Sequence, residues 1–408
     1  MRILLVNKFI FPKGGAETYT FDVGKMLEEH GHEVQYFGLE NEKNTVGNRI
    51  GSYVTNMDFS QGIKANLNAP FRIIYSREAR KKIRAVLDDF QPDVVHLNNI
   101  QYHLTPSIIL EINKWRKETK KECKIVYTTH DYQLVCPSHG MFDVNMKPCE
   151  RCLDGHYIHC FQTKCLKNSR AKSLLGTFDG YMWKYSKAYS YVDAYICCSF
   201  FLKSKLDTQK RFRDKTIGLH NFKKEMPHLD NIQKKGYVLE FGHLSRDKGT
   251  DTLLEVAKKM PNTEFVFVGY GPSADKMKDI PNVKYLGFKT GEELYRIIAE
   301  AAISVCPSEM YENCPYSVME SVLLGTPVVG AKMGGIPELI EPGKTGELFE
   351  AGTVEELMKA IKKVLQTQDV LERYTKNCSH VNYETTESYY VKLMKIYRGE
   401  KNVEQISS

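Results

Sequence analysis

The sequence predicts an α/β protein of two doubly wound, Rossmann-like domains, and three observations lead to this prediction. A chain of 408 residues exceeds what one ordinary hydrophobic core organises, so two large units are expected. Short β-branched runs alternate with longer amphipathic stretches, which is the pattern of βα units around parallel sheets. The polar stretch 221–235, with Pro227 and four lysines, has the composition of a hinge.

The strands are expected at the β-branched runs, and the domains follow from them. We place the first domain at 1–220, a linker at 221–235 and the second domain at 236–382. Residues 383–408 are expected to form a C-terminal helix that packs back across the hinge, followed by a tail. A ligand is expected between the domains, at the carboxyl ends of the strands. The predicted strands are 3–6, 33–37, 94–97, 125–128, 194–197 and 216–219 in the first domain, then 237–241, 264–268, 283–286, 303–305 and 328–329 in the second.

Composition and charge narrow the class of protein. Hydrophobic residues make up 42% of the chain and charged residues 26%, as in soluble globular proteins. No apolar run reaches the roughly 18 residues of a membrane-spanning helix. We interpret residues 1–7 as a first strand rather than a signal peptide, so a cytoplasmic protein is expected.

The net charge of +7 is concentrated in four basic clusters before the middle of the chain. These clusters could attract an anionic membrane surface, here the inner face of the plasma membrane, or an acidic substrate. The alternative is that they are solvated helix faces. No recognised nucleic-acid-binding motif accompanies them, so nucleic acid is not an expected partner. The clusters span 77–84, 114–124, 164–172 and 203–215.

The stretch Glu312-Asn-Cys-Pro-Tyr-Ser-Val-Met-Glu320 places two carboxylates around the start of a helix. Pro315 suits the first helical position, and Gly325 suits the end of the helix. The free amides of the first turn favour a diphosphate, while a carboxylate on either side can accept hydrogen bonds from sugar hydroxyls. This arrangement predicts a nucleotide-sugar site. The alternative is that Glu312 caps the helix and Glu320 is a solvated helix residue.

Two strand ends of the first domain carry further candidates. Gly14 and Gly15 occupy the first strand-to-helix turn, where the missing side chain lets the backbone approach a ligand closely. A tight turn alone is the alternative. His130 follows the strand at 125–128 and is expected at the rim of the sheet on the ligand side, with a structural histidine as the alternative.

The second domain has a comparable strand end at Phe-Gly-His-Leu-Ser-Arg-Asp-Lys-Gly, residues 241–249. Arg246 and Lys248 lie near the start of the following helix, where cations oppose the helix dipole and a bound anion would relieve the arrangement. Ordinary exposed side chains are the alternative. Further glycine turns at 268–272, 287–289 and 334–338 are expected to line the floor of a cleft.

Taken in order, these motifs resemble family 4 of the retaining glycosyltransferases, which has the GT-B fold of two Rossmann-like domains facing an interdomain cleft. The resemblance implies transfer of a hexose-like unit from a UDP- or GDP-sugar to a glycan or polyprenyl-linked acceptor in surface polysaccharide biosynthesis. The chain contains no Asp-x-Asp, so no catalytic metal is expected. The matching segments cover essentially the whole chain: 14–17, 92–96, 129–131, 242–249, 269–272, the pair of glutamates and 334–338.

The resemblance also assigns roles, residue by residue. It implies that Glu320 binds the ribose hydroxyls, that Glu312 binds the hydroxyls of the transferred sugar and that Lys248 neutralises the diphosphate. Charge on the leaving group is met by cations and preorganised amides in such a site. The remaining implied contacts are amides around Tyr316 and Ser317 with the diphosphate, Gly14 and Gly15 with a phosphate, His130 with the sugar near the reacting carbon, and the backbone near Phe288 with the base.

Two positions depart from the family pattern. His243 stands where the family commonly has an arginine directly after the glycine, and Arg246 is expected to supply the second cation near the diphosphate. Asn98 stands where relatives often carry another histidine.

Five of the eleven cysteines fall within thirty residues, in an insertion at about 136–165. Cys149 and Cys152 have the spacing of a thiolate knuckle, and Cys136 with Cys165 or Cys160 could complete a tetrahedral site. In a reducing cytoplasm structural zinc is preferred to disulfides. Scattered reduced thiols and an iron–sulfur or redox role are the alternatives. The insertion belongs to the acceptor-side domain, so we expect it to shape acceptor binding.

Two other functions compete with a glycosyltransferase at this stage. A nucleotide-sugar epimerase shares the architecture but consumes no acceptor. A non-catalytic, zinc-bearing scaffold could retain the fold without the reaction. The sugar, the base and the acceptor are not determined by the motifs.

Overall fold

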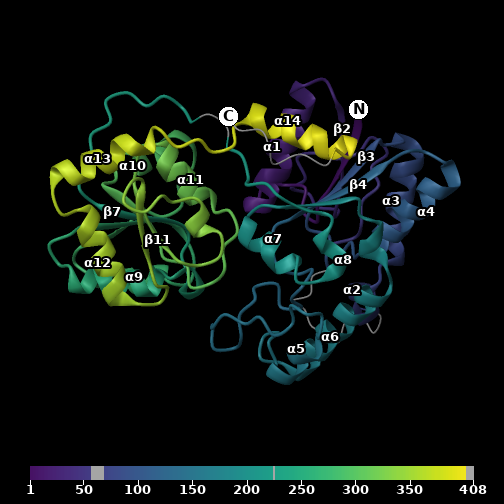
Figure 1. Cartoon of the computed structure of the whole chain (residues 1–408), viewed down its shortest axis with the longest axis horizontal. Helices are drawn as coiled ribbons and strands as arrows, with labels where there is room; N and C mark the ends of the chain where they lie inside the picture. Colours follow the sequence, from purple (N-terminus) through teal and green to yellow (C-terminus); the bar gives the residue numbers. More distant parts are fainter. Residues whose placement is uncertain (57–68, 224–225, 401–408) are drawn as a thin grey trace. The chain divides into compact units, whose positions relative to one another are not determined.

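The computed structural model describes residues 1–56, 69–223 and 226–400 and divides the chain into two compact units (Figure 1). The first unit comprises Met1–Gly140, Glu150–Leu219 and Thr386–Ser408, and the second comprises Met141–Cys149 and His220–Thr385. Each unit is built on its own parallel sheet, so each is described separately.

The first unit contains a six-stranded parallel sheet with the order β2-β1-β3-β4-β5-β6. Its strands are apolar on both faces: Ile3, Leu4, Leu5 and Val6 of β1 are all fully buried. Continuous burial of this kind occurs where helices cover both faces of a parallel sheet. The strands are β1 (Arg2–Val6), β2 (Glu33–Phe37), β3 (Val94–Leu97), β4 (Lys124–Thr129), β5 (Ala194–Cys197) and β6 (Thr216–Gly218).

The helices of the first unit include the last helix of the chain, because α14 is grouped with this unit. Two tyrosines of α14 form hydrogen bonds with this unit: Tyr389 with Tyr19 at 2.6 Å and Tyr397 with His96 at 2.7 Å. The helices are α1 (Gly15–Glu29), α2 (Ala69–Ile74), α3 (Arg77–Phe90), α4 (Ser107–Thr119), α5 (Ile158–Thr163), α6 (Arg170–Tyr185), α7 (Phe200–Leu206), α8 (Lys210–Arg213) and α14 (Thr386–Arg398).

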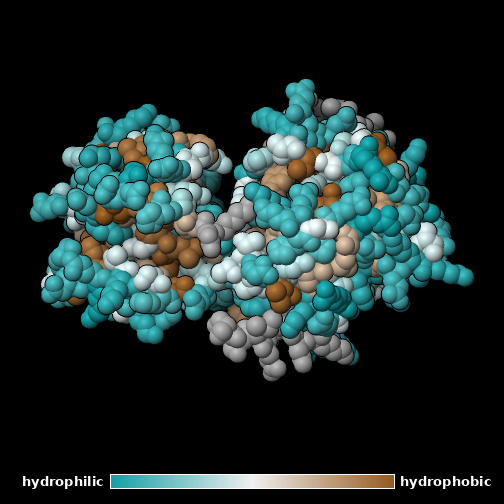
Figure 2. Space-filling view, turned by 90° about the horizontal axis from the view of Figure 1, so that it is seen from above, coloured by the Kyte–Doolittle hydropathy of each residue, from teal (hydrophilic) through white to brown (hydrophobic). Residues whose placement is uncertain are grey.

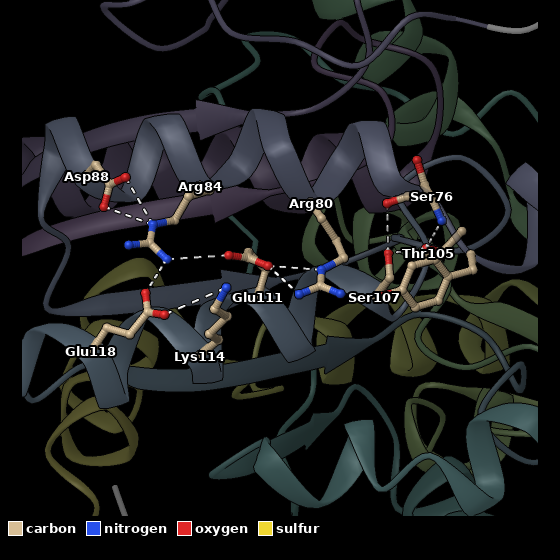
Figure 3. Close-up of polar contacts among 10 residues, drawn as sticks. Ser76, Arg80, Arg84, Asp88, Thr105, Ser107, Glu111, Lys114 and Glu118 are labelled. Atoms are coloured by element: carbon tan, nitrogen blue, oxygen red, sulfur yellow. Dashed lines mark hydrogen bonds and ion pairs between the residues drawn. The ribbon is translucent and has the colours of Figure 1, made fainter.

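A network of ion pairs joins α3 and α4 (Figure 3). Arg80 and Arg84 both contact Glu111, which is nearly buried, and Arg84 also contacts Asp88 at 2.9 Å and Glu118 at 2.5 Å. The basic cluster predicted at 77–84 therefore has two of its cations neutralised by carboxylates of the same unit.

The second unit contains another six-stranded parallel sheet, with the order β12-β11-β10-β7-β8-β9. Helices α9 (Thr250–Lys259), α10 (Gly291–Glu300), α11 (Tyr316–Leu323), α12 (Val354–Val364) and α13 (Gln368–Cys378) belong to it. Its strands are β7 (Val238–His243), β8 (Phe265–Tyr270), β9 (Val283–Tyr285), β10 (Ile303–Cys306), β11 (Val328–Ala331) and β12 (Gly346–Phe349).

All the strands predicted from β-branched runs are present, with ends that shift by at most two residues. The fold prediction of two doubly wound α/β units is confirmed. Strand β12 was missed because it begins with Gly346, a poor strand former. A Cβ at Gly346 would lie 1.8 Å from the carbonyl oxygen of Val328, so the close pairing of β12 with β11 requires glycine there.

The segment expected as a linker, 221–235, is grouped with the second unit. Lys223 donates its backbone N–H to Glu384, and Lys235 donates its own to Glu300. Lys234 Nζ donates to Thr326 Oγ1 at 2.8 Å. The described part of the segment is thus anchored along the second unit.

The surface is mostly hydrophilic on the face shown in Figure 2, with hydrophobic side chains gathered in patches. Among the residues that the structure describes, no helix combines the length and the hydrophobicity that crossing a bilayer would require.

Candidate active site

Helix α11 begins at Tyr316, one residue later than predicted. Pro315 is the N-cap, with an extended backbone at φ −68° and ψ 119°, and not the first helical residue. A proline side chain cannot accept a hydrogen bond, so the N-cap residue itself does not cap the first-turn amides. Gly325, at φ 73°, follows the end of the helix as predicted. The first turn of α11, with the amides of Tyr316 and Ser317, has the backbone arrangement that binds anions at helix starts.

Lys248 and Glu312 meet beside this helix start. Their side chains form an ion pair, and Ser308 Oγ donates to the same Glu312 oxygen at 3.2 Å. Burial lowers the pKa of Lys248, but the attraction of the Glu312 carboxylate outweighs burial, so the pKa lies above its usual value. Lys248 is therefore a permanent cation at neutral pH, and the structure brings together two residues that the sequence placed 64 positions apart.

The loops that carry this pair are fixed by backbone contacts. Glu309 donates its N–H to Asp247 at 3.0 Å, which links the Lys248 turn to the loop before α11. Gly335 donates its N–H to the Glu312 carbonyl at 2.7 Å. Gly334 has φ 64°, and a Cβ there would lie 2.0 Å from the same carbonyl oxygen. Glycine at 334 is thus required to hold the Glu312 backbone in place.

Glu320 lies on α11 and forms an ion pair with Lys223, with 2.6 Å between Nζ and Oε1. The Lys223 ammonium also lies 5.3 Å from the centroid of the Tyr316 ring. Sequence reasoning missed Lys223, because it is one of four lysines in a segment with the composition of a linker. No signal in the sequence distinguishes it from its neighbours.

His243 ends β7 within a group of aromatic side chains. Its ring lies 5.4 Å from that of Tyr270, and Tyr270 lies 5.8 Å from Phe288, both in edge-to-face geometry. All three side chains are exposed. Arg246 is also exposed, and no ion pair of its guanidinium occurs among the residues that the structure describes. The role of Arg246 as a second cation near the diphosphate stays a prediction.

Glu240 is a buried carboxyl group of β7 that sequence reasoning also missed. Thr250 Oγ1 donates to its Oε1 at 2.7 Å, while Oε2 has no hydrogen-bond partner in the described part of the chain. Burial raises the pKa of Glu240 to about 8, so the carboxyl group is mainly protonated at neutral pH. The only sign of a buried carboxyl group in the sequence was a glutamate between the apolar strand residues Leu239 and Phe241.

His130 follows β4 in the first unit, at the carboxyl end of the strand, as predicted. Its Nε2 donates to Asn98 Oδ1 at 2.9 Å, and the Tyr19 ring packs against it at 4.9 Å. Burial lowers the pKa of His130 to about 4, although the neighbouring Asp131 carboxylate acts in the opposite direction. The imidazole is therefore neutral at physiological pH. Asn98, the departure from the family pattern, is the residue that fixes its tautomer.

A chain of buried polar groups lies on the same sheet. Tyr19 OH bonds to Thr128 Oγ1 at 3.0 Å, and Thr128 Oγ1 bonds to His96 Nε2 at 2.7 Å. Tyr389 and Tyr397 of α14 complete the two ends of this chain. Burial lowers the pKa of His96 to about 3, so this histidine is neutral and structural. The chain holds α1 and β4, which carry Gly15 and His130.

Gly14 and Gly15 lie at the start of α1, as predicted. Gly14 is the N-cap with extended backbone, and Gly15 is the first helical residue. Glu17 in the first turn is buried and accepts from Asn7 Nδ2 at 3.0 Å. The Glu17 carboxylate in this turn is therefore hydrogen-bonded within the protein.

The five clustered cysteines, all within the described residues, form no disulfide. Cys152 and Cys160 pack with Tyr157 in a hydrophobic cluster, and Cys160 Sγ lies 2.8 Å from Cys165 Sγ. Among the described residues, no group of three or more His, Cys, Asp or Glu side chains is arranged to hold a metal ion. Structural zinc at Cys136, Cys149, Cys152 and Cys165 stays a prediction.

Comparison with known proteins gives two family matches that adjoin. Residues 13–221 match the family described as Glycosyltransferase Family 4, and residues 221–380 match Glycosyl transferases group 1. An uncharacterized 42.6 kDa protein in the cps region of Klebsiella pneumoniae is 24% identical over 83% of this chain and 87% of that protein. The amylovoran biosynthesis glycosyltransferase AmsK of Erwinia amylovora is 28% identical, over 37% of this chain and 41% of that protein.

A solved structure with a similar fold is that of Anabaena Alr3699/HepE in complex with UDP. It superposes with a TM-score of 0.67 at 16% identity, covering 98% of this chain and all of that one. The Family 4 match alone covers half of the chain, and the solved structure shares both units. The chain therefore belongs to glycosyltransferase family 4 and is a glycosyltransferase with the GT-B fold of two Rossmann-like units.

Proposed function

We propose that this glycosyltransferase transfers a hexose-like unit from a UDP- or GDP-sugar, with retention, to a glycan or polyprenyl-linked acceptor in surface polysaccharide biosynthesis. Relatives named for a cps region and for amylovoran biosynthesis support the pathway class, and a neighbour solved with UDP supports a nucleotide-sugar donor. Both relatives have low sequence identity to this chain, so the proposal rests mainly on the geometry of the site.

The observation that carries the proposal is the Lys248–Glu312 ion pair, whose glutamate lies three residues ahead of the Pro315 N-cap of α11. A diphosphate at the helix start would find the Lys248 ammonium and the amides of Tyr316 and Ser317. The Glu312 carboxylate, released from part of its pairing with Lys248, would accept hydrogen bonds from the hydroxyls of the transferred sugar. Glu320, one and a half turns further along, would accept those of the ribose.

The reaction we propose needs no catalytic metal. The bond between the anomeric carbon and the phosphate oxygen breaks, and the acceptor oxygen forms its bond on the same face of the sugar. The acceptor proton passes to the leaving phosphate oxygen, whose negative charge Lys248 and the α11 amides stabilise. Loss of one preorganised donor of this kind costs about 3 kcal/mol of transition-state stabilisation.

For the first unit, the proposed donor contacts are the Gly14–Gly15 turn with a phosphate and His130 with the sugar near the reacting carbon. His130 suits a binding role because its imidazole is neutral, with a pKa of about 4. A lipid-linked acceptor would bring the protein to the inner face of the plasma membrane as a peripheral protein.

The test is a thermal-shift screen of the purified chain against UDP-, GDP- and ADP-sugars. A matching donor at a hundred times its Kd stabilises the fold by about 2.7 kcal/mol. Glu320→Ala should abolish the shift, and Glu264→Ala, an exposed glutamate of the same unit, should not. Absence of a shift with every donor would contradict the donor assignment.

A second measurement separates transfer from epimerisation. Release of nucleoside diphosphate should require the acceptor, because an epimerase consumes none and releases none. Conversion of the donor to its epimer without acceptor would overturn the proposed reaction while leaving the donor site in place.

A further inference from the structure

Helix α6 buries one face that combines small residues with Trp183, and it leaves several large apolar residues exposed on the opposite face. Ser173, Gly176 and Thr177 are buried, and Gly180 is partly buried. A Cβ at Gly176 would lie 2.4 Å from Leu166, and one at Gly180 would lie 2.8 Å from Tyr157. The glycines therefore let this part of α6 pack closely against the first unit, and Trp183 is the large apolar side chain that the same face buries.

The outer face of α6 carries exposed apolar side chains. Leu174 is 54% exposed, Phe178 is 58% exposed and Tyr185 is 71% exposed. They follow one another at intervals of four and seven residues, which places them on one stripe of a helix. The outer face of a surface helix is normally polar, so an apolar stripe there, in addition to the buried Trp183 on the inner face, is unusual. An exposed apolar stripe of this kind marks an interaction surface.

Cations surround this stripe. Residues 157–192 contain six Lys and Arg side chains and one acidic residue, Asp179, which is turned inward and accepts from Trp183 Nε1 at 2.9 Å. Within the described residues, no ion pair neutralises the four cations before and at the start of α6, whereas Arg80 and Arg84 of α3 are neutralised as Figure 3 shows. These four cations are Lys164, Lys167, Arg170 and Lys172.

We infer that the outer face of α6, labelled in Figure 1, docks the protein on a bilayer that contains anionic lipids. Leu174 and Phe178 enter the boundary between headgroups and acyl chains, Tyr185 lies at headgroup level, and the surrounding cations contact lipid phosphates. A second copy of the chain fits this face poorly, because two such positively charged faces would repel each other. Docking would give the protein access to a lipid-linked acceptor, and this purpose rests on the proposed function. The docking surface itself does not depend on it.

The test is cosedimentation of the full chain with vesicles, without donor or acceptor. We expect binding to vesicles of phosphatidylcholine mixed with phosphatidylglycerol, little binding to phosphatidylcholine alone, and weaker binding in high salt. The double variant L174Q/F178Q should bind about tenfold or more weakly, because two apolar side chains no longer leave water. Val391→Gln, at an exposed apolar position of α14, is the matched control and should bind like the unmodified chain.

A second set of variants tests the charges. Each Lys or Arg near an anionic surface strengthens binding about fivefold, so K167Q/R170Q/K172Q should lose about a hundredfold. The control is K359Q/K362Q, which removes two exposed cations of α12 in the second unit and should have little effect.

Three results would overturn the inference. They are indifference of the unmodified chain to anionic vesicles, unchanged binding of both α6 variants, and a dimer in light scattering that L174Q/F178Q converts to a monomer. Transfer to a soluble acceptor analogue separates the two proposals. If L174Q/F178Q keeps transfer but the unmodified chain ignores vesicles, only the docking surface fails; if vesicles bind but no donor shifts the melting temperature, only the proposed function fails.

Discussion

Lys223 holds Glu320 through an ion pair in which neither side chain is more than 14% exposed. The two residues are 97 positions apart, and their contact joins the start of the second unit to α11. A carboxylate held in this way has one orientation, which suits a group that must accept hydrogen bonds from two adjacent hydroxyls.

Lys223→Ala should lower the free energy of unfolding by about 2 kcal/mol, because it leaves a nearly buried carboxylate without its cation. Urea denaturation measures the effect. The double variant K223A/E320A should recover part of the loss, since it removes the unpaired charge as well. Lys235→Ala, whose ion pair with Glu300 is largely exposed on the lysine side, is the control; equal losses for the two lysines would contradict the importance of the buried pair.

Lys248→Ala should lower kcat/KM by about a hundredfold or more, because the leaving diphosphate loses the cation that is paired with Glu312 ahead of α11. Release of nucleoside diphosphate in the presence of acceptor measures this. The control is Lys276→Ala, which removes an exposed lysine paired with Asp251 in the same unit and should leave the rate unchanged. If Lys248→Ala were as active as the unmodified chain, another group would have to neutralise the charge of the leaving diphosphate.

Glu240 should make the stability fall as pH rises from about 4.5 to about 8. The unfolded carboxyl group loses its proton near 4.5, while the folded one keeps it until about 8, so the folded state binds more protons across this window. The stabilisation is complete below 4.5 and is lost as pH rises through 8, at up to about 1.4 kcal/mol per pH unit. Chemical denaturation at several pH values measures the slope.

Glu240→Gln should remove this contribution and stabilise the protein at pH 8 relative to the unmodified chain, because the amide stays neutral. Glu264→Gln, at an exposed position, is the matched control and should leave the slope unchanged. A slope that persists in Glu240→Gln would assign the dependence to other groups.

Tyr397→Phe should cost about 1–3 kcal/mol, because buried His96 Nδ1 loses its hydrogen-bond partner. Thermal or urea unfolding measures the loss. Tyr185→Phe removes a hydroxyl from a side chain that is mostly exposed and should change stability by less than about 0.5 kcal/mol. If the two variants were equally stable, the buried chain of polar groups would contribute nothing.

The strands were predictable because burial of a parallel sheet demands apolar, β-branched residues on both faces, and this signal is local. Strand β12 was not predicted because it begins with Gly346, which has a low strand propensity. Glycine is required there by the closeness of the Val328 backbone. The start of α11 was predicted one residue early for a related reason: Pro315 has a φ that either position accepts, and only its ψ of 119° places it outside the helix.

The positions of candidate residues in the fold were predictable where glycines and charges follow strands, as at Gly15, His130, Lys248 and Glu312. The partners of these residues were not. Lys223 and Tyr397 reach their partners across 97 and 301 positions, so their roles exist only after folding. The exposed apolar stripe of α6 was equally hidden, because its periodicity is that of any amphipathic helix, and only the packing decides which face is inward.

The grouping of α14 with the first unit has a consequence for biosynthesis. Residues 220–385 are an insertion within the chain of the first unit, whose last helix leaves the ribosome after the whole second unit has been made. Until then, Tyr19 and His96 lack the tyrosine hydroxyls that bond to them in the finished protein. A nascent chain stopped before Thr386 therefore holds a first unit with incomplete polar pairing, while all residues of the second unit have already been made.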